Sequence, residues 1–167
     1  MYKRQGVIED PHDELPRDDR SIDDLRDDDM RVYRDLKPET IQGVMSCHVC
    51  FPRIDGLPAS LSYRFLTEEL RDRLFFQGPI FSDDLMMGAL DSIAKPEGLA
   101  RMALEAGADM VLLCNSDNAT DRVLDSDGLP VQSEASRRRL EAMRPDPAYT
   151  ADDALLSEAR ERMSRHI

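Results

Sequence analysis

The sequence predicts an α/β protein in which helices alternate with the strands of a parallel sheet. Helical and strand-like patterns follow one another along the chain from about residue 21, which is the order expected of βα units. The stretch Asp109-Met-Val-Leu-Leu-Cys114 is a continuous apolar run, typical of strands in parallel sheets that are covered on both faces. The 167 residues suffice for one modest domain with a single core.

The first predicted helix begins at Ser21, where Asp24 three residues later resembles a capping box. Its apolar positions recur at roughly helical spacing as far as Leu36, and Pro38 ends it. Its remaining face consists almost entirely of Asp and Arg, a pattern typical of a solvated helix surface. A strand is then expected over Ile41–Phe51.

A second helix is expected to open within Pro58-Ala-Ser-Leu-Ser62, with Ser60 or Ser62 as its cap. Leu66, Leu70 and Leu74 would line one side of it. A buried strand should follow, and it is built from four apolar residues around a glycine turn: Phe75, Phe76, Ile80 and Phe81.

A third helix is predicted over Pro96–Ala106, with Gly107 in the usual position just past its end. The strand Asp109–Cys114 comes next. From about Ser133 the pattern is helical, interrupted by Pro145 and Pro147. Three clear strands, with a fourth in doubt, are too few for a closed eight-stranded α/β barrel, which usually needs about 250 residues.

Composition excludes several classes of function. The net charge of −12 and the pI of about 4.6 argue against nucleic acid or an anionic membrane as a partner. No apolar run reaches the roughly 18 residues of a transmembrane helix, and no secretory signal is visible at the charged amino terminus. Three cysteines are an odd number, which fits a reducing compartment. A cytoplasmic protein is therefore expected.

Two adjacent carboxylates, Asp83 and Asp84, end the strand that starts near Ile80. In parallel α/β sheets, reactive groups lie just past the carboxyl ends of strands, and unpaired carboxylates are costly to bury. Alternation along a strand would send the two side chains to opposite sides. The residues alone leave two readings open: a catalytic carboxylate, or one acid that caps the next helix beside one that is solvated.

Other chemistry-bearing residues give weaker signals. Cys47-His-Val-Cys50 lies at a strand end with no second such pair in the chain, so two small semi-buried thiols are favoured over a redox or zinc site that would recruit Cys114. In Asp10-Pro-His12 the Asp can orient the imidazole as a proton donor. His48 is either a hydrogen-bonded structural histidine or a sugar contact, and His166 is expected to have no role.

Taken together and in order, these segments resemble the bacterial β-N-acetylhexosaminidases of glycoside hydrolase family 3. Asp10-Pro-His-Asp-Glu-Leu-Pro16 is similar to that family's Asp-Ser-His-x-x-x-Pro loop. Met45–Pro52 and Asp55–Ser62 are similar to its Met-Pro-Ala-His-Val-x-Tyr-Pro and Asp-x-x-Pro-Ala-Ser-x-Ser stretches. Phe81–Met87 and Ala106–Asn115 complete a match that covers about residues 6 to 115.

The resemblance implies a retaining glycosidase on a (β/α)8 TIM barrel, with no metal and no organic cofactor. By motif position it implies that Asp83 is the nucleophile, that His12 is the general acid/base and that Asp10 orients His12. His48 and Asn115 are candidate contacts to the substrate. The implied substrate is a terminal N-acetylglucosamine on small muropeptides, released when cell wall is recycled in the cytoplasm.

The departures from the family pattern bear on completeness. The family's Lys-His-Phe-Pro-Gly-His-Gly segment should lie just before Asp10, and only Lys3-Arg-Gln-Gly6 stands there. Pro11 replaces a small Ser, and Pro79 stands where the strand usually has an apolar residue with an N–H to donate. We therefore expect a partial barrel, its carboxyl-terminal half, over residues 1–132, and a helical tail over 133–167 that packs on it.

Three further expectations follow. Without the other half, the chain should self-associate or require a missing amino-terminal half. A non-catalytic remnant, or one half of a split enzyme, is the alternative to an active glycosidase. A metal-dependent phosphotransfer site on Asp83 and Asp84 is a third reading, but it needs a further acid and a lysine on neighbouring strand ends.

Overall fold

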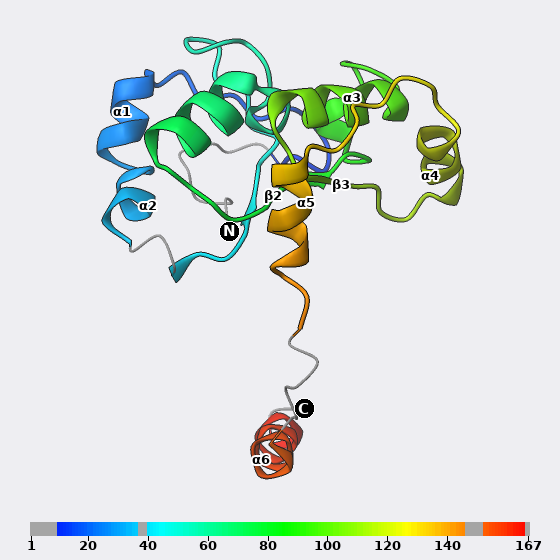
Figure 1. Ribbon diagram of the computed structural model, residues 1–167. Helices are drawn as coiled ribbons and strands as arrows, with labels where there is room; N and C mark the ends of the chain where they lie inside the picture. Colours follow the sequence, from blue (N-terminus) through cyan, green and yellow to red (C-terminus); the bar gives the residue numbers. More distant parts are fainter. Residues whose placement is uncertain (1–9, 37–39, 146–151, 166–167) are drawn as a thin grey trace.

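The computed structural model describes residues 10–36, 40–145 and 152–165 (Figure 1). Its elements, in chain order, are α1 (Ile22–Asp27), α2 (Arg31–Asp35), β1 (Val44–Met45), η2 (Ala59–Leu61), η3 (Arg64–Arg73), β2 (Ile80–Asp84), η4 (Gly88–Leu90), α3 (Pro96–Ala106), β3 (Met110–Leu112), α4 (Asp117–Leu124), α5 (Glu134–Glu141) and α6 (Asp153–Ser164). The elements η2 and η4 are 3-10 helices, and η3 is a π-helix.

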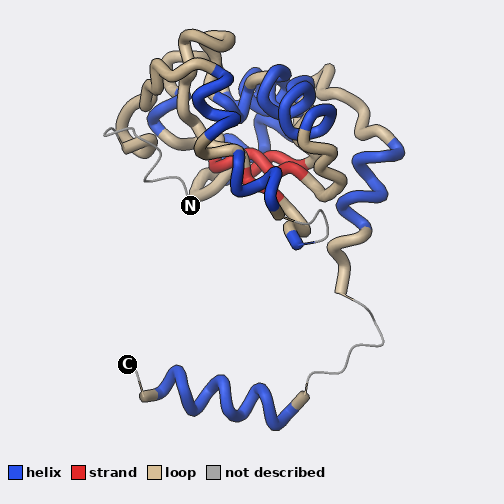
Figure 2. Tube along the Cα trace, turned by 90° about the vertical axis from the view of Figure 1, so that its left-hand side faces the viewer, coloured by secondary structure: helices blue, strands red, loops and turns tan. Residues whose placement is uncertain are grey.

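The described strands form one parallel sheet of order β1-β2-β3. Helices η3 and α3 lie together over one side of it (Figures 1 and 2). The main core fills the space between these helices and the central strand, where Ile80, Leu90 and Ala103 are fully or almost fully buried. The predicted α/β class with parallel strands is confirmed, and the arrangement is that of a partial barrel.

Strand β2 carries an irregularity next to its acidic end. Phe81 pairs with Met110 and Asp84 pairs with Leu112, so β2 has one more residue than β3 between the two pairs. The side chain of Ser82, which is fully buried, accepts a hydrogen bond from the Leu112 amide (2.9 Å). Such β-bulges bend a strand and redirect its side chains, and they are frequent beside active sites.

The single first helix that the periodicity predicts is instead two short helices. The capping box is present at the start of α1, where the Ser21 and Asp24 side chains bond each other's backbone amides. The helix then ends, because the Met30 amide bonds back to the Leu25 carbonyl (2.8 Å) within a run of aspartates. Val32 is exposed, so the apolar stripe after the break is not covered.

The prediction of a long first strand over Ile41–Phe51 is also wrong, since only Val44–Met45 is a strand. Beyond it the chain turns, and the Cys50 amide bonds Pro16 instead of a β2 partner. Phe75, expected inside the next strand, is 71% exposed and has a positive φ of 54°. It directly follows Leu74, the C-cap of η3, and β2 begins only at Ile80.

The last strand is not covered on both faces as predicted. Met110 is exposed, and Val111 to Leu113 are only partly buried. Strand β3 lies at the edge of the described sheet with β2 as its neighbour. An apolar run read from sequence does not tell whether both flanks are covered in the chain at hand.

Helix α3 agrees with the sequence prediction at both ends. It begins with Pro96 at its first position and ends at Gly107, whose φ of 115° is left-handed. A β-carbon at position 107 would lie 2.5 Å from the Thr67 hydroxyl of η3. The glycine therefore serves both the cap and the close packing of the two helices.

Helix α4 was not predicted, although Ser116 caps it through a bond from the Ala119 amide. Helix α5 begins where the helical pattern was expected, and Ser133 caps it by accepting a bond from the Ser136 amide. All residues of α6 are exposed, and it lies apart from the sheet (Figure 2). The division of the chain at residue 133 stays a prediction. Pro38, Pro147, His166 and the segment 3–6 fall outside the described residues.

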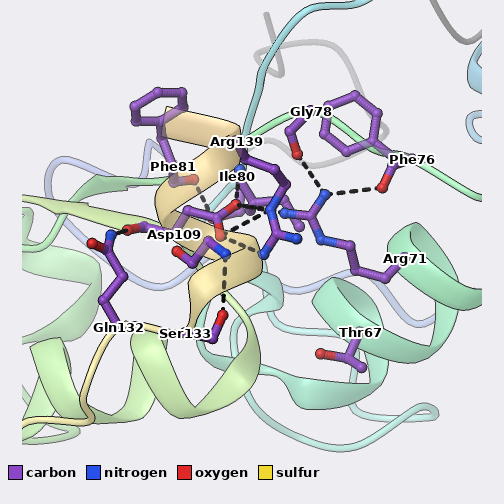
Figure 3. Close-up of polar contacts among 12 residues, drawn as sticks. Thr67, Arg71, Phe76, Gly78, Ile80, Phe81, Asp109, Gln132, Ser133 and Arg139 are labelled. Carbon is purple, nitrogen blue, oxygen red and sulfur yellow. Dashed lines mark hydrogen bonds and ion pairs between the residues drawn. The ribbon is translucent and has the colours of Figure 1, made fainter. Parts of the chain in front are cut away.

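A buried ion cluster ties α5 to the amino-terminal end of the sheet (Figure 3). The Asp109 carboxylate accepts hydrogen bonds from Arg139 of α5, from Arg71 of η3 and from the Ile80 amide (2.8 Å). Burial by itself would raise the pKa of Asp109, but the Arg139, Ile80 and Ser136 hydrogen bonds and the Arg71 charge outweigh it and hold that pKa below its usual value. The cluster is structural, because it lies at the opposite end of the strands from Asp83.

No helix in the described part of the chain is long and apolar enough to span a bilayer.

Candidate active site

The carboxyl ends of the three strands come together around Asp83 and Asp84. Cys47 and His48 follow β1, the two acids end β2, and Cys114 follows β3. Burial lowers the pKa of His48, and the charges of the two acids oppose that shift. Desolvation and the charges of the same two acids together raise the pKa of Cys114. The site therefore lies where ligands bind in parallel α/β folds.

Asp84 forms hydrogen bonds with the backbone of neighbouring segments. Its Oδ1 accepts hydrogen bonds from the amides of Met86 (3.0 Å) and Cys114 (2.9 Å). Its carbonyl oxygen accepts from the Met87 amide (3.2 Å) and from the ring of His48. This residue joins all three strand ends. Its role is structural, but it is not the helix cap that the sequence left open for one of the two acids, because Met87 is the N-cap of η4 and no side chain caps that helix.

Asp83 is in a different position. Within the described residues, its carboxylate accepts one hydrogen bond, from the adjacent Asp84 amide (2.9 Å). Its side chain is partly exposed, and the residue lies within the β-bulge between Phe81 and Asp84. A carboxylate at a strand end, without a cation held against it in the described residues, is available to a ligand.

The buried ring of His48 connects η2 and β2 through a hydrogen bond at each of its nitrogens. Its Nδ1 lies 2.6 Å from the Ser60 hydroxyl and its Nε2 lies 2.9 Å from the Asp84 carbonyl. A carbonyl only accepts, so Nε2 carries the proton and Ser60 donates to Nδ1. Burial lowers the pKa of His48 and favours this neutral ring. The ring is 1% exposed, so the geometry favours the structural alternative over a direct sugar contact.

The cysteines show no sign of redox or metal chemistry in the described part of the chain. All three are free thiols. Burial raises the pKa of Cys47 to about 11, which leaves it protonated and unreactive at neutral pH. The described residues contain no group of three or more His, Cys, Asp or Glu side chains that could hold a metal ion.

Asp10 and His12 form a pair on a loop. Asp10 Oδ1 lies 2.7 Å from His12 Nδ1 and also accepts the His12 backbone N–H (3.1 Å). Both side chains are exposed to solvent. The Nδ1–H donated to a carboxylate fixes the ring orientation and leaves Nε2 directed elsewhere, the arrangement that a histidine acid/base needs.

This loop, residues 10–14, is attached to the chain that follows Asp83. The Gly88 amide donates to the His12 carbonyl and the Ala89 amide donates to the Pro11 carbonyl, both at 3.2 Å. The folded chain thus brings the loop and the strand end together, although they are far apart in the sequence.

Asn115 lies just past β3, is exposed and has a positive φ of 59°. Asn tolerates this left-handed conformation better than most residues. The structure places it at the same end of the sheet as Asp83, and its predicted role as a substrate contact stays a prediction.

Sequence reasoning missed two features of the site. The bulge at Ser82 leaves no signal in the order of residues, since it depends on the register against β3. Gly88 could have been noted as a glycine a few residues past the acids, but its partner, the loop at residues 10–14, is distant in sequence. An apolar cavity between α1, α2 and β1 is lined in part by Tyr33 and Phe65, and it includes Cys47 but neither of the two acids.

Comparisons with known proteins agree on one family. Residues 6–140 match the model described as "Glycosyl hydrolase family 3 N terminal domain". A protein named β-hexosaminidase from Bordetella avium is 36% identical over 169 residues, covering 99% of this chain and 47% of the relative. One of the same name from Thioalkalivibrio sulfidiphilus is 46% identical over 121 residues, covering 72% of this chain and 35% of the relative.

Solved structures give the same result. Native NagZ from Neisseria gonorrhoeae superposes with a TM-score of 0.76 at 32% identity, covering 92% of this chain and 43% of that one. A family 3 β-N-acetylglucosaminidase from Paenibacillus superposes with a TM-score of 0.75 at 28% identity, covering 88% of this chain and 31% of that one. The chain thus spans less than half the length of these relatives.

Proposed function

The chain belongs to glycosyl hydrolase family 3, through the N-terminal domain that its residues 6–140 match, and on that premise we propose that it carries the catalytic carboxylate and the proton donor of a retaining β-N-acetylhexosaminidase. One observation carries the proposal: the loop that holds the Asp10–His12 pair is hydrogen-bonded to the turn that follows Asp83. The two groups of a double-displacement reaction are thereby attached to one another.

In the first step of this proposal, an Asp83 carboxylate oxygen attacks the anomeric carbon and the bond to the leaving oxygen breaks. His12, protonated on both nitrogens, gives its Nε2 proton to that oxygen while Nδ1–H stays bonded to Asp10. Water then attacks the glycosyl-aspartate as neutral His12 accepts a proton at Nε2, which releases the sugar with retained configuration and regenerates both groups.

Asp84 supports this step without taking part in it. Its carboxylate bonds two backbone amides and its carbonyl bonds His48. These contacts fix the backbone on which Asp83 is carried. Fixing the nucleophile in this way reduces the reorganisation that the reaction requires.

The proposed substrate is a terminal N-acetylglucosamine, with muropeptides of cell-wall recycling in the cytoplasm as the source. The names of the relatives support the first part: several are β-hexosaminidases, and one NagZ structure is a complex with N-trifluoroacetyl-D-glucosamine. The muropeptide and the compartment rest on the family resemblance alone.

The alternative is a chain that keeps the family's motifs without turnover, or one half of a split enzyme. Turnover that arises only when a second polypeptide supplies the family's Lys-His segment would identify a split enzyme.

The experiment compares leaving groups. With His12→Ala we expect kcat/KM for alkyl or sugar aglycones to fall by about 100-fold or more, and that for a nitrophenyl glycoside to fall far less, because nitrophenolate needs little protonation. Asp10→Ala should give a milder version of the same pattern.

The matched control is Asp13→Ala, on the same loop, which should leave both classes of substrate unchanged. Equal losses on both classes with His12→Ala would mean that His12 binds or supports structure and does not donate the proton.

A further inference from the structure

The contact between the dyad loop (residues 10–14) and η4 requires a residue without a side chain. A β-carbon at position 88 would lie 2.6 Å from the His12 carbonyl oxygen and 3.1 Å from that of Asp13. Both are backbone atoms, so rotation of a side chain cannot relieve the clash. Any residue other than glycine must therefore move the loop or the turn.

The turn is the less mobile of the two. Met87, Ala89 and Leu90 are buried, and Leu85 is bonded to the Leu112 carbonyl at 2.9 Å. Asp84 holds the start of the turn through the Met86 amide. The loop, in contrast, is exposed at both Asp10 and His12, so a side chain at position 88 would displace the loop.

The loop also depends on η4 for partners. Its internal bonds run from Asp13 and Glu14 back to the Asp10 carbonyl, at 3.0 and 3.1 Å. These bonds close the loop on itself but do not fix its position relative to the rest of the chain. In the described residues, the carbonyls of Pro11 and His12 are bonded to Ala89 and Gly88 of the η4 turn, which does fix it.

We propose that Gly88 is a positioning residue, which lets the loop rest on η4 and so sets the place of the His12 imidazole relative to Asp83. This inference rests on the proposed function for its catalytic consequence, since the placement matters only if His12 donates a proton to a bond that Asp83 attacks. The placement itself does not depend on that function.

The first test measures amide hydrogen exchange by NMR in the 167-residue chain. In Gly88→Ala, the Ala89 amide should exchange about tenfold faster or more, since opening of the loop exposes it. The amides of Ser46 and Asp109, which bond β2 carbonyls at 2.9 and 2.7 Å, should stay protected and report an intact sheet. Unchanged exchange at Ala89 would overturn the proposal.

The matched control is Gly43→Ala, because a β-carbon there meets its nearest neighbour, the Phe81 ring, at 3.4 Å, and the backbone at 3.7 Å. That is ordinary contact, so Ala89 exchange should not change. Faster exchange in both variants would mean a general loosening and would contradict a specific role for Gly88.

The second test uses the leaving-group comparison. Gly88→Ala should reduce kcat/KM for alkyl aglycones by about tenfold to 100-fold with much less loss on nitrophenyl glycosides, and should add little to His12→Ala. Equal losses on both classes would overturn the link to proton donation. If the unaltered protein hydrolyses neither class, the proposed function fails, while the exchange test still decides the placement of the loop.

Discussion

At the scale of single residues, two neighbouring carboxylates meet different surroundings. Asp84 Oδ1 accepts two backbone amides from different segments, whereas Asp83 accepts one from its own neighbour. The first pattern makes a carboxylate part of the framework, and the second leaves it available for chemistry. Adjacent residues can differ in this way because the β-bulge lies between the paired residues Phe81 and Asp84: Asp84 is paired with Leu112 of β3, and Asp83 lies within the bulge.

This difference predicts that replacing Asp84 lowers the free energy of unfolding more than replacing Asp83 does. Asp84→Ala leaves two amides without an acceptor and should cost about 2–3 kcal/mol in the free energy of unfolding, while Asp83→Ala should cost less than about 1 kcal/mol. Asp84→Asn keeps one oxygen and should recover much of the loss. Urea unfolding at pH 7 measures all three, and a larger loss for Asp83→Ala than for Asp84→Ala would contradict the assignment.

The sequence reached several of these residues. Asp83, Asp10 and His12 were singled out because they fall in motifs that resemble those of a family, and their catalytic roles stay predictions. The capping box at Ser21 is confirmed, and it could be predicted because both of its partners are local. The sequence could not decide between the alternative roles of Asp84 or of His48. Each role depends on hydrogen bonds to residues more than ten positions away in the chain.

At the scale of elements, the predictions held where local signals decide the structure. Helix α3 has Pro96 at its start and Gly107 past its end, and both bounds were predicted. Only two residues of the predicted strand Ile41–Phe51 form a strand. Strand pairing depends on which segment lies alongside, and the Cys50 amide bonds the Pro16 carbonyl instead of a residue of β2. Periodicity cannot report such a partner.

The link between α5 and the sheet yields a prediction of its own. Asp109→Asn leaves Arg71 and Arg139 facing a neutral group in a buried site, and should cost about 3–5 kcal/mol. Arg122→Gln, which breaks the more exposed pair with Glu97, is the control and should cost less than about 1 kcal/mol. Similar losses in urea unfolding would show that the cluster is not an anchor.

The same cluster predicts a dependence on pH. The folded-state pKa of Asp109 lies below its ordinary value of 3.8, so the contribution of Asp109 to stability is fully present above that value and is lost as the pH falls through the folded-state pKa. The free energy of unfolding should therefore drop below about pH 4, and Asp109→Asn should remove part of that drop. An acid limb identical in the two proteins would contradict the assigned ionisation.

At the scale of the whole molecule, the described sheet has three strands and two edges. Met45 and Met110, one on each edge strand, are 40% and 41% exposed. Apolar side chains on uncovered edge strands promote pairing with other chains. The number of strands in the sequence predicts a partial barrel. It does not predict which apolar side chains on the edge strands are exposed.

We therefore expect the 167-residue chain to associate when it is prepared alone. Size-exclusion chromatography with light scattering should show species heavier than the monomer, and Met110→Lys on β3 should shift them toward the monomer, because a charge on an edge strand opposes pairing. Val131→Lys, at an exposed site outside the sheet, is the control and should not. A monomer at all concentrations would show that the edges do not drive association.

Asp83 is the residue proposed to form the covalent bond to the sugar, and covalent labelling tests that role most directly. A 2-fluoro glycoside with a good leaving group, incubated with the catalytically competent protein, should leave a glycosyl adduct that peptide mass spectrometry places on Asp83. Asp83→Asn should abolish both the adduct and nearly all turnover. An adduct on Asp84, or turnover that survives Asp83→Asn, would contradict the account.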